Sequence, residues 1–339
     1  MARKNYLSIH YLRIMACLMV ILIHISATPV VSLNANSVAQ VFFILINQFA
    51  KPAVPIFIMI SGFLLHGIYK DTELAPIAYW TKRLPKLVIP YVLWSLGYYL
   101  IYLKMGYYPW NLKFVLEGLL LGTFIYHLYF MVIIIQFYVL YPVLHFIFKR
   151  IGMIPLFIAI LSIQFLLIKV PFEYRDRLFI TYFCYFGLGM LLSIYLPKLM
   201  KVWKIQYMGI IGFIIAGTLN SWLVLNSQNS WLVLPEFVHI FSYTFLSLLC
   251  CLSLFVFFEG LTLTSSMKQT RQVQIGKLSN ATQLIYFAHP LFILLSEYIM
   301  NQLGVISISL RAFSAFTSIM VLLVPAAYYS KNNFVLKKS

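Results

Sequence analysis

Ten long apolar segments dominate the chain, and short polar stretches separate each from the next. They cover residues 8–28, 38–66, 86–103, 127–148, 152–169, 178–196, 205–225, 233–258, 278–299 and 307–329. A helix needs about 20 apolar residues to cross the hydrocarbon core of a bilayer. The pattern therefore predicts an all-α polytopic membrane protein with about ten transmembrane helices.

The second segment is too long for one plain span and carries Lys51-Pro52-Ala53-Val54-Pro55 near its middle. Proline removes a backbone donor and breaks or kinks a helix. Backbone groups freed at membrane depth must face protein or water, so we expect these helices to surround a central cavity, with Lys51 as a buried cation. The alternative is an interfacial Lys51 that marks a shorter span starting later.

Basic residues gather in alternate loops between the apolar segments. Seventeen lysines and arginines lie on one side of the predicted membrane, and five lie on the other: Lys104, Lys113, Lys169, Arg175 and Arg177. By the positive-inside rule, both termini face the cytoplasm of a multi-pass protein in the cell (plasma or inner) membrane.

Composition and charge also bear on the class of protein and on its partners. The chain is 62% hydrophobic and 10% charged, with a formal net charge of +17. Because the charge follows the loops, it indicates topology rather than a nucleic-acid partner. The cysteines all fall in apolar segments without CxxC spacing, so disulfides and metal sites are not expected. Residues 1–339 are expected to form one transmembrane domain without an appended soluble domain, and the first apolar run to be retained as a span rather than cleaved.

Two ionisable residues stand out in the first span. Arg13 and His24 are eleven positions apart, so they share one helix face about 16 Å apart along the axis. An ionisable side chain inside hydrocarbon costs about 2.5 kcal/mol or more and usually faces protein or a wet cavity. His24 is either a neutral imidazole bonded to a neighbouring helix or a base at the bottom of a cavity.

Polar residues elsewhere suggest further sites. Lys82, Arg83 and Lys86 precede the third span, where they either set topology or hold an anion such as the phosphates of a nucleotide. His127 and Tyr129 open the fourth span, where aromatic residues usually form an interface belt.

The later part of the chain carries one more histidine of interest. His289 lies in the ninth span at a depth comparable to that of His24, three residues after Tyr286 and directly before Pro290. Glu297 and Arg311 are expected to pair at the outer ends of the last two spans.

Two outer stretches complete the pattern. Residues 111–122 read as a short amphipathic helix on the outer face, with Lys113 and Glu117 as an i,i+4 pair. The charged stretch 169–177 reads as a solvated surface loop, or else as a contact to a polar or anionic acceptor. We find no Walker A motif, dinucleotide fingerprint, HExxH motif or internal repeat.

Taken together, these residues resemble the membrane acyltransferase-3 family over essentially the whole chain. The resemblance rests on five motifs in order: Arg13-x10-His24, Lys51 with VPIFIMISGFLL, Lys82/Arg83/Lys86 before Pro90-Tyr91, His127-Leu-Tyr-Phe, and Tyr286-x-x-His289-Pro290. Two positions depart from the family pattern. Tyr129 replaces a larger aromatic residue, and Lys51 replaces an arginine. A lysine ammonium group is a point charge and cannot make the two parallel hydrogen bonds of a guanidinium group.

The resemblance implies transfer of an acyl group, commonly acetyl, from cytoplasmic acyl-CoA to a hydroxyl of a cell-surface glycan or its lipid-linked precursor. The partners are then acyl-CoA as a co-substrate, the saccharide acceptor and the lipid bilayer, with no permanently bound cofactor. Alternatives are succinyl transfer to a poly-N-acetylglucosamine-type polymer within the same family, and a non-enzymatic glycan precursor transporter or flippase.

The residues suit this chemistry. A hydroxyl becomes a nucleophile when a base removes its proton, and histidine titrates in the right range. His24 is the candidate base, with His289 as a further catalytic candidate. Lys51 and Tyr286 are candidates to stabilise the oxyanion. Arg13 is a candidate both for catalysis and for donor binding. The other residues expected to bind the donor are Lys82, Arg83 and Lys86, and acceptor binding is expected from His127 and Tyr129.

Overall fold

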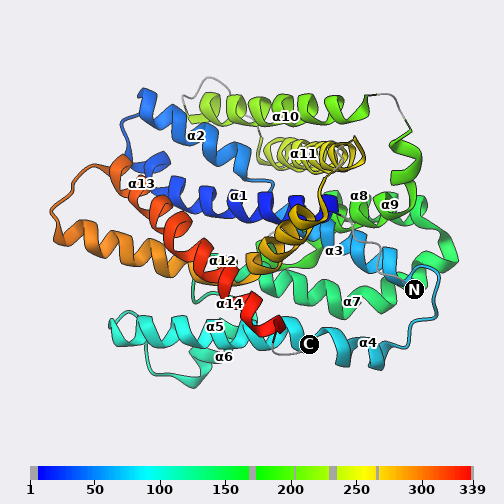
Figure 1. The fold of residues 1–339 in the computed structure, drawn as a ribbon, viewed down its shortest axis with the longest axis horizontal. Helices are drawn as coiled ribbons and strands as arrows, with labels where there is room; N and C mark the ends of the chain where they lie inside the picture. Colours follow the sequence, from blue (N-terminus) through cyan, green and yellow to red (C-terminus); the bar gives the residue numbers. More distant parts are fainter. Residues whose placement is uncertain (1–6, 168–172, 202–203, 229–234, 265–266, 337–339) are drawn as a thin grey trace. The chain divides into compact units, whose positions relative to one another are not determined.

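The computed structural model describes residues 7–167, 173–201, 204–228, 235–264 and 267–336. Within these ranges the chain is helical and contains no strand. Figure 1 shows the order of its elements: α1 (Leu7–Ser32), α2 (Val38–Ala50), α3 (Ala53–Tyr69), α4 (Pro76–Arg83), α5 (Pro85–Lys104), α6 (Leu112–Leu121), α7 (Tyr129–Ile151), α8 (Met153–Leu167), η1 (Arg175–Arg177), η2 (Phe179–Tyr182), α9 (Phe183–Leu199), α10 (Ile205–Gln228), α11 (Glu236–Thr264), α12 (Gln269–Gln302), α13 (Ile308–Ser318), η3 (Ile319–Leu323) and α14 (Val324–Leu336).

The predicted class is confirmed, because nine helical segments of the described chain are long and apolar enough to cross a membrane. The predicted span 152–169 corresponds to α8, which has 15 residues. At 1.5 Å per residue, α8 covers about 22 Å, which is less than the hydrocarbon core. The protein is therefore a multi-pass membrane protein, and of the fifth predicted span residues 168 and 169 lie outside the described ranges.

The predicted break in the second segment is also confirmed. Helix α2 ends at Ala50 and α3 begins at Ala53, so Lys51 and Pro52 form the junction. Lys51 is partly buried there. The break follows from the local sequence, because Pro52 and Pro55 each lack a backbone donor.

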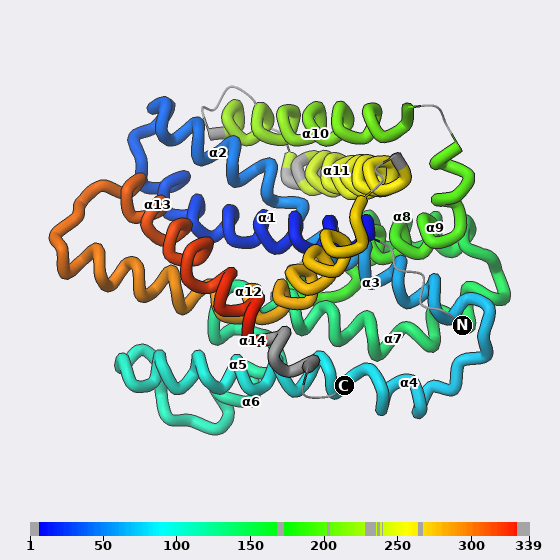
Figure 2. The backbone as a smooth tube through the Cα atoms, in the orientation of Figure 1, coloured from blue at the N-terminus to red at the C-terminus, as the bar shows by residue number. Residues whose placement is uncertain are grey.

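The chain divides into two compact units. The first consists of Met1–Ile60 and Pro197–Ser339. Within it, α1 packs against α2, α11, α12 and α13, and α10 packs against α2 and α11. The tube in Figure 2 shows α10 beside α11 and α1 next to α2. Helix α1 is thus the central helix of this unit.

The second unit is Ser61–Leu196. Helix α7 is its centre and packs against α4, α5, α6, α8, η1 and η2. A small residue after the helix break allows a close approach, because a Cβ on Gly62 would clash with the Phe186 carbonyl of α9. A backbone contact this close is possible only for glycine.

Two predicted local features are present at the helix ends. The short amphipathic helix is α6, capped by the Asn111 side chain and ended by Gly122 in the left-handed region, with φ +67°. Lys113 Nζ lies 3.7 Å from Glu117 Oε1 along its exposed face. The predicted ion pair between α12 and α13 also forms, with Arg311 Nη1 3.1 Å from Glu297 Oε2.

Candidate active site

The structure brings the two predicted histidines together in the first unit. The rings of His24 on α1 and His289 on α12 are stacked, with centroids 5.3 Å apart and planes 23° apart. The His289 side chain is fully buried, whereas His24 is partly exposed. Of the two rings, only His24 has exposed surface.

Tyr286 joins the pair from the preceding turn of α12. Its ring centroid lies 6.1 Å from that of His289, and its side chain is buried. The Nδ1 atom of His289 is 2.7 Å from the backbone carbonyl oxygen of Tyr286. A carbonyl oxygen accepts hydrogen bonds only, so Nδ1 is the donor of this bond.

Amide side chains from α2 hold the segment of α1 that carries His24. The Asn47 amide nitrogen donates to Ser26 Oγ at 3.0 Å and to the Ile23 carbonyl oxygen at 3.3 Å. The neighbouring Gln48 side chain accepts a 2.9 Å hydrogen bond from Asn220 of α10. Side-chain hydrogen bonds between helices fix their relative rotation in a membrane. Sequence reasoning missed these residues, although three amides inside apolar segments are a signal that could have identified them.

The two predicted cations of the first unit occupy different helices. Arg13 lies eleven residues before His24 on α1, so about 16 Å of helix separates them along the axis. Lys51 lies at the α2–α3 junction, with Nζ 5.5 Å from the ring centroid of Tyr243. The Tyr243 hydroxyl donates to the Lys51 carbonyl oxygen at 3.4 Å. Tyr243 therefore makes two contacts at the break: its ring lies near the Lys51 ammonium group, and its hydroxyl bonds to the Lys51 carbonyl oxygen.

The basic cluster lies in the second unit, at the junction of α4 and α5. Lys82 and Lys86 are exposed, and Arg83 is partly buried. Arg83 Nε donates to the Tyr69 hydroxyl at 3.2 Å, and its guanidinium lies 5.5 Å from the Tyr69 ring centroid. This contact positions one cation of the cluster and leaves two others at the surface, an arrangement suited to an anion.

His127 and Tyr129 also belong to the second unit. The His127 side chain is buried, and its ring stands edge-on to Tyr98 at 5.7 Å and near Tyr126 at 5.9 Å. Tyr129 is the first residue of α7. His127 is thus enclosed by protein, which differs from the lipid-facing position of an aromatic belt.

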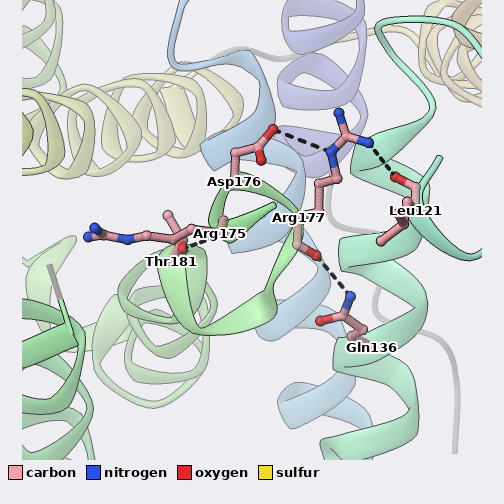
Figure 3. A network of polar contacts seen from close by, with 6 residues as sticks. All are labelled: Leu121, Gln136, Arg175, Asp176, Arg177 and Thr181. Atoms are coloured by element: carbon pink, nitrogen blue, oxygen red, sulfur yellow. Dashed lines mark hydrogen bonds and ion pairs between the residues drawn. The ribbon is translucent and has the colours of Figure 1, made fainter. Parts of the chain in front are cut away.

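Arg177 organises the charged stretch next to these residues (Figure 3). Its Nη1 donates to the Leu121 carbonyl oxygen at 3.0 Å, and its backbone carbonyl accepts from Gln136 Nε2 at 2.9 Å. Its Nε is 3.6 Å from the Asp176 carboxylate, and the Arg177 side chain is only 22% exposed. The interpretation of this stretch as a solvated loop is wrong for Arg177, and residues 169–172 lie outside the described ranges.

Burial and chemistry limit other kinds of site. Cys17, Cys184, Cys250 and Cys251 are buried free thiols. In the part of the chain that the structure describes, no group of three histidine, cysteine or acidic side chains could hold a metal ion.

Comparison with known proteins places the chain in a family. A family model for the acyltransferase-3 group, described as an acyltransferase domain, matches residues 6–330. No curated protein and no solved structure matches the chain. The matched region includes both histidines, the helix break and the basic cluster, and it covers nearly the full length. The chain belongs to the acyltransferase-3 family and is a membrane acyltransferase.

Proposed function

We propose that this membrane acyltransferase transfers an acetyl group from cytoplasmic acetyl-CoA to a hydroxyl of a cell-surface glycan or of its lipid-linked precursor. The observation that carries the proposal is the stacked pair of His24 and His289 on α1 and α12. It supports hydroxyl activation because a partly exposed imidazole at membrane depth is a base that an acceptor can reach.

The proposed reaction is a single acyl transfer with His24 as general base. His24 takes the proton from the acceptor hydroxyl as its oxygen bonds to the thioester carbonyl carbon. The tetrahedral oxyanion then collapses, the carbon–sulfur bond breaks, and the departing thiolate receives the proton from His24. In this proposal Lys51 and Tyr286 stabilise the oxyanion.

Donor binding is assigned to the basic residues that the sequence singled out for it. Arg13 on α1 and the cluster of Lys82, Arg83 and Lys86 would contact the phosphates and pantetheine arm of acyl-CoA, which is a co-substrate rather than a resident cofactor. Arg83 supports this role because Tyr69 holds its guanidinium in place. Pre-oriented guanidinium groups bind phosphate bidentately.

The acceptor is assigned to His127 and Tyr129. A saccharide offers hydroxyl donors and acceptors together with apolar ring faces, and imidazole and phenol side chains complement both. The enclosure of His127 by Tyr98 and Tyr126 supports an aromatic-walled site. The basic loops support cytoplasmic termini and donor entry from the cytoplasm of a cell membrane.

The test is acyl transfer by purified full-length protein in lipid nanodiscs, with radiolabelled acetyl-CoA and a cell-envelope glycan extract. We expect CoA release that requires the acceptor and falls at least about a hundredfold in His24→Ala. His10→Ala is the matched control, because His10 lies on the same helix and is not part of the stacked pair. Full activity in a folded His24→Ala variant would overturn the assignment of the base.

The same assay separates the alternatives. Labelling from succinyl-CoA, but not acetyl-CoA, onto poly-N-acetylglucosamine would replace the acetyl proposal with succinyl transfer. Absence of labelling with every donor, together with movement of a lipid-linked saccharide across the bilayer, would favour the transporter. Label retained on His24 after rapid quenching would show that the acyl group passes through the imidazole.

A further inference from the structure

Pro290 follows His289 directly and lies inside α12 (Gln269–Gln302). In an α-helix the N–H of each residue donates to the carbonyl four positions earlier. The carbonyl that pairs with position 290 belongs to Tyr286, and proline has no N–H to donate. The ordinary backbone donor for the Tyr286 carbonyl is therefore missing.

The imidazole of His289 takes the place of that donor. Its Nδ1 lies 2.7 Å from the Tyr286 carbonyl oxygen. A neutral imidazole carries one N–H, and the bond assigns this hydrogen to Nδ1, so Nε2 carries the lone pair. The side chain is 0% exposed, so bulk water does not compete for the bond.

The placement of the two histidines shows how this tautomer matters. His289 is fully buried and His24 is partly exposed, so His289 acts on a reacting molecule through the ring stacked on it. When His24 takes up a proton, both of its nitrogens become donors. A neighbouring lone pair stabilises that imidazolium, whereas a neighbouring N–H would oppose it.

We propose that Pro290 is a positioning residue: by leaving the Tyr286 carbonyl to Nδ1 of His289, it fixes the tautomer in which Nε2 carries the lone pair in the ring stacked on His24. The catalytic consequence rests on the proposed function, but the tautomer does not. The rival explanation is that Pro290 serves only to bend α12.

The tautomer is tested without turnover, by solid-state NMR of full-length protein labelled with ¹⁵N-histidine in lipid. His289→Gln assigns the His289 signals by their disappearance. We expect a protonated Nδ1 and an unprotonated Nε2 in the wild type. In Pro290→Ala the new backbone N–H competes for the Tyr286 carbonyl, so we expect both tautomers. Pro142→Ala, at another buried proline inside a helix, should leave the His289 signals unchanged.

Measurements of acyl transfer distinguish a chemical role of His289 Nε2 from a purely structural role of the Nδ1 hydrogen bond. The side-chain amide of His289→Asn can still donate to the Tyr286 carbonyl but offers no acceptor at the Nε2 position. We expect acyl transfer to fall about a hundredfold in His289→Asn and about tenfold in Pro290→Ala, in kcat rather than in KM for the donor.

The outcomes are distinct. An unprotonated Nδ1 in the wild type, or unchanged His289 signals in Pro290→Ala, would overturn the proposal. Full activity of His289→Asn would also overturn it by showing that only the Nδ1 bond matters, and this variant decides the question if Pro290→Ala does not fold. Absence of transfer by wild-type protein would instead reject the proposed function while leaving the tautomer result standing.

Discussion

Arg177 anchors the last turn of α6, and its replacement by alanine gives a quantitative test of the second unit. The substitution removes the bond to the Leu121 carbonyl oxygen, which is 3.0 Å long, and the contact of Nε with Asp176. A hydrogen bond from a charged donor contributes about 1.5–3 kcal/mol. A cation at a helix C-terminus adds about 0.3–1 kcal/mol.

The ion pair adds little to this sum. The Asp176 side chain is 63% exposed, so solvent screens its attraction to Arg177, and exposed pairs are worth about 0–1 kcal/mol. We therefore expect Arg177→Ala to lower the free energy of unfolding by about 2–4 kcal/mol. Arg177→Lys should recover less than half of the loss, because a lysine lacks the planar fork.

The measurement is reversible SDS unfolding in mixed micelles, followed by intrinsic fluorescence. Arg175→Ala is the matched control, because it removes the same charge two residues earlier from a side chain that points away from the network in Figure 3. If Arg177→Ala unfolds at the same SDS concentration as Arg175→Ala, the energetic role given to Arg177 is refuted.

Two further predictions concern a close helix contact and the donor site. Gly62→Ala forces a methyl group against the Phe186 carbonyl, so we expect about 1–3 kcal/mol of destabilisation in the same unfolding assay. Gly97→Ala, where a Cβ meets nothing within 4 Å, should not destabilise; equal losses in both would contradict the packing argument. Arg83→Gln should raise KM for acyl-CoA about tenfold, equivalent to about 1.4 kcal/mol, with little change in kcat. Lys104→Gln is its charge-matched control, and equal KM values in the two variants would remove Arg83 from the donor site.

The helical class, the broken second segment and the ends of α6 could be predicted from consecutive residues. Apolar length against bilayer thickness determines which segments become helices. Pro52 and Pro55 interrupt a helix whatever surrounds them, and Asn111 and Gly122 cap one locally. The pair of Glu297 and Arg311 was also predictable, because a short loop joins their two helices.

For the candidate site, the sequence indicated the residues but not the contacts between them. The residue types and their depths singled out His24 and His289, but the contact between them required α1 to pack against α12. Apolar helix faces are equally compatible with lipid and with one another, so hydrophobic pattern does not select partners in a membrane. Shape and side-chain amides such as Asn47 and Asn220, which bond to neighbouring helices, make that selection.

The sequence by itself thus determined a polytopic helical membrane protein, its family and the polar residues that its apolar segments carry at a cost. The tertiary structure alone decided that His24 and His289 stack, that Arg177 turns inward to α6, and that Lys51 lies against Tyr243. The physical reason is that a polar residue within an apolar segment can be recognised from that segment alone, because burying it in hydrocarbon costs free energy. The partner that offsets this cost comes from another part of the chain, and only packing brings the two together.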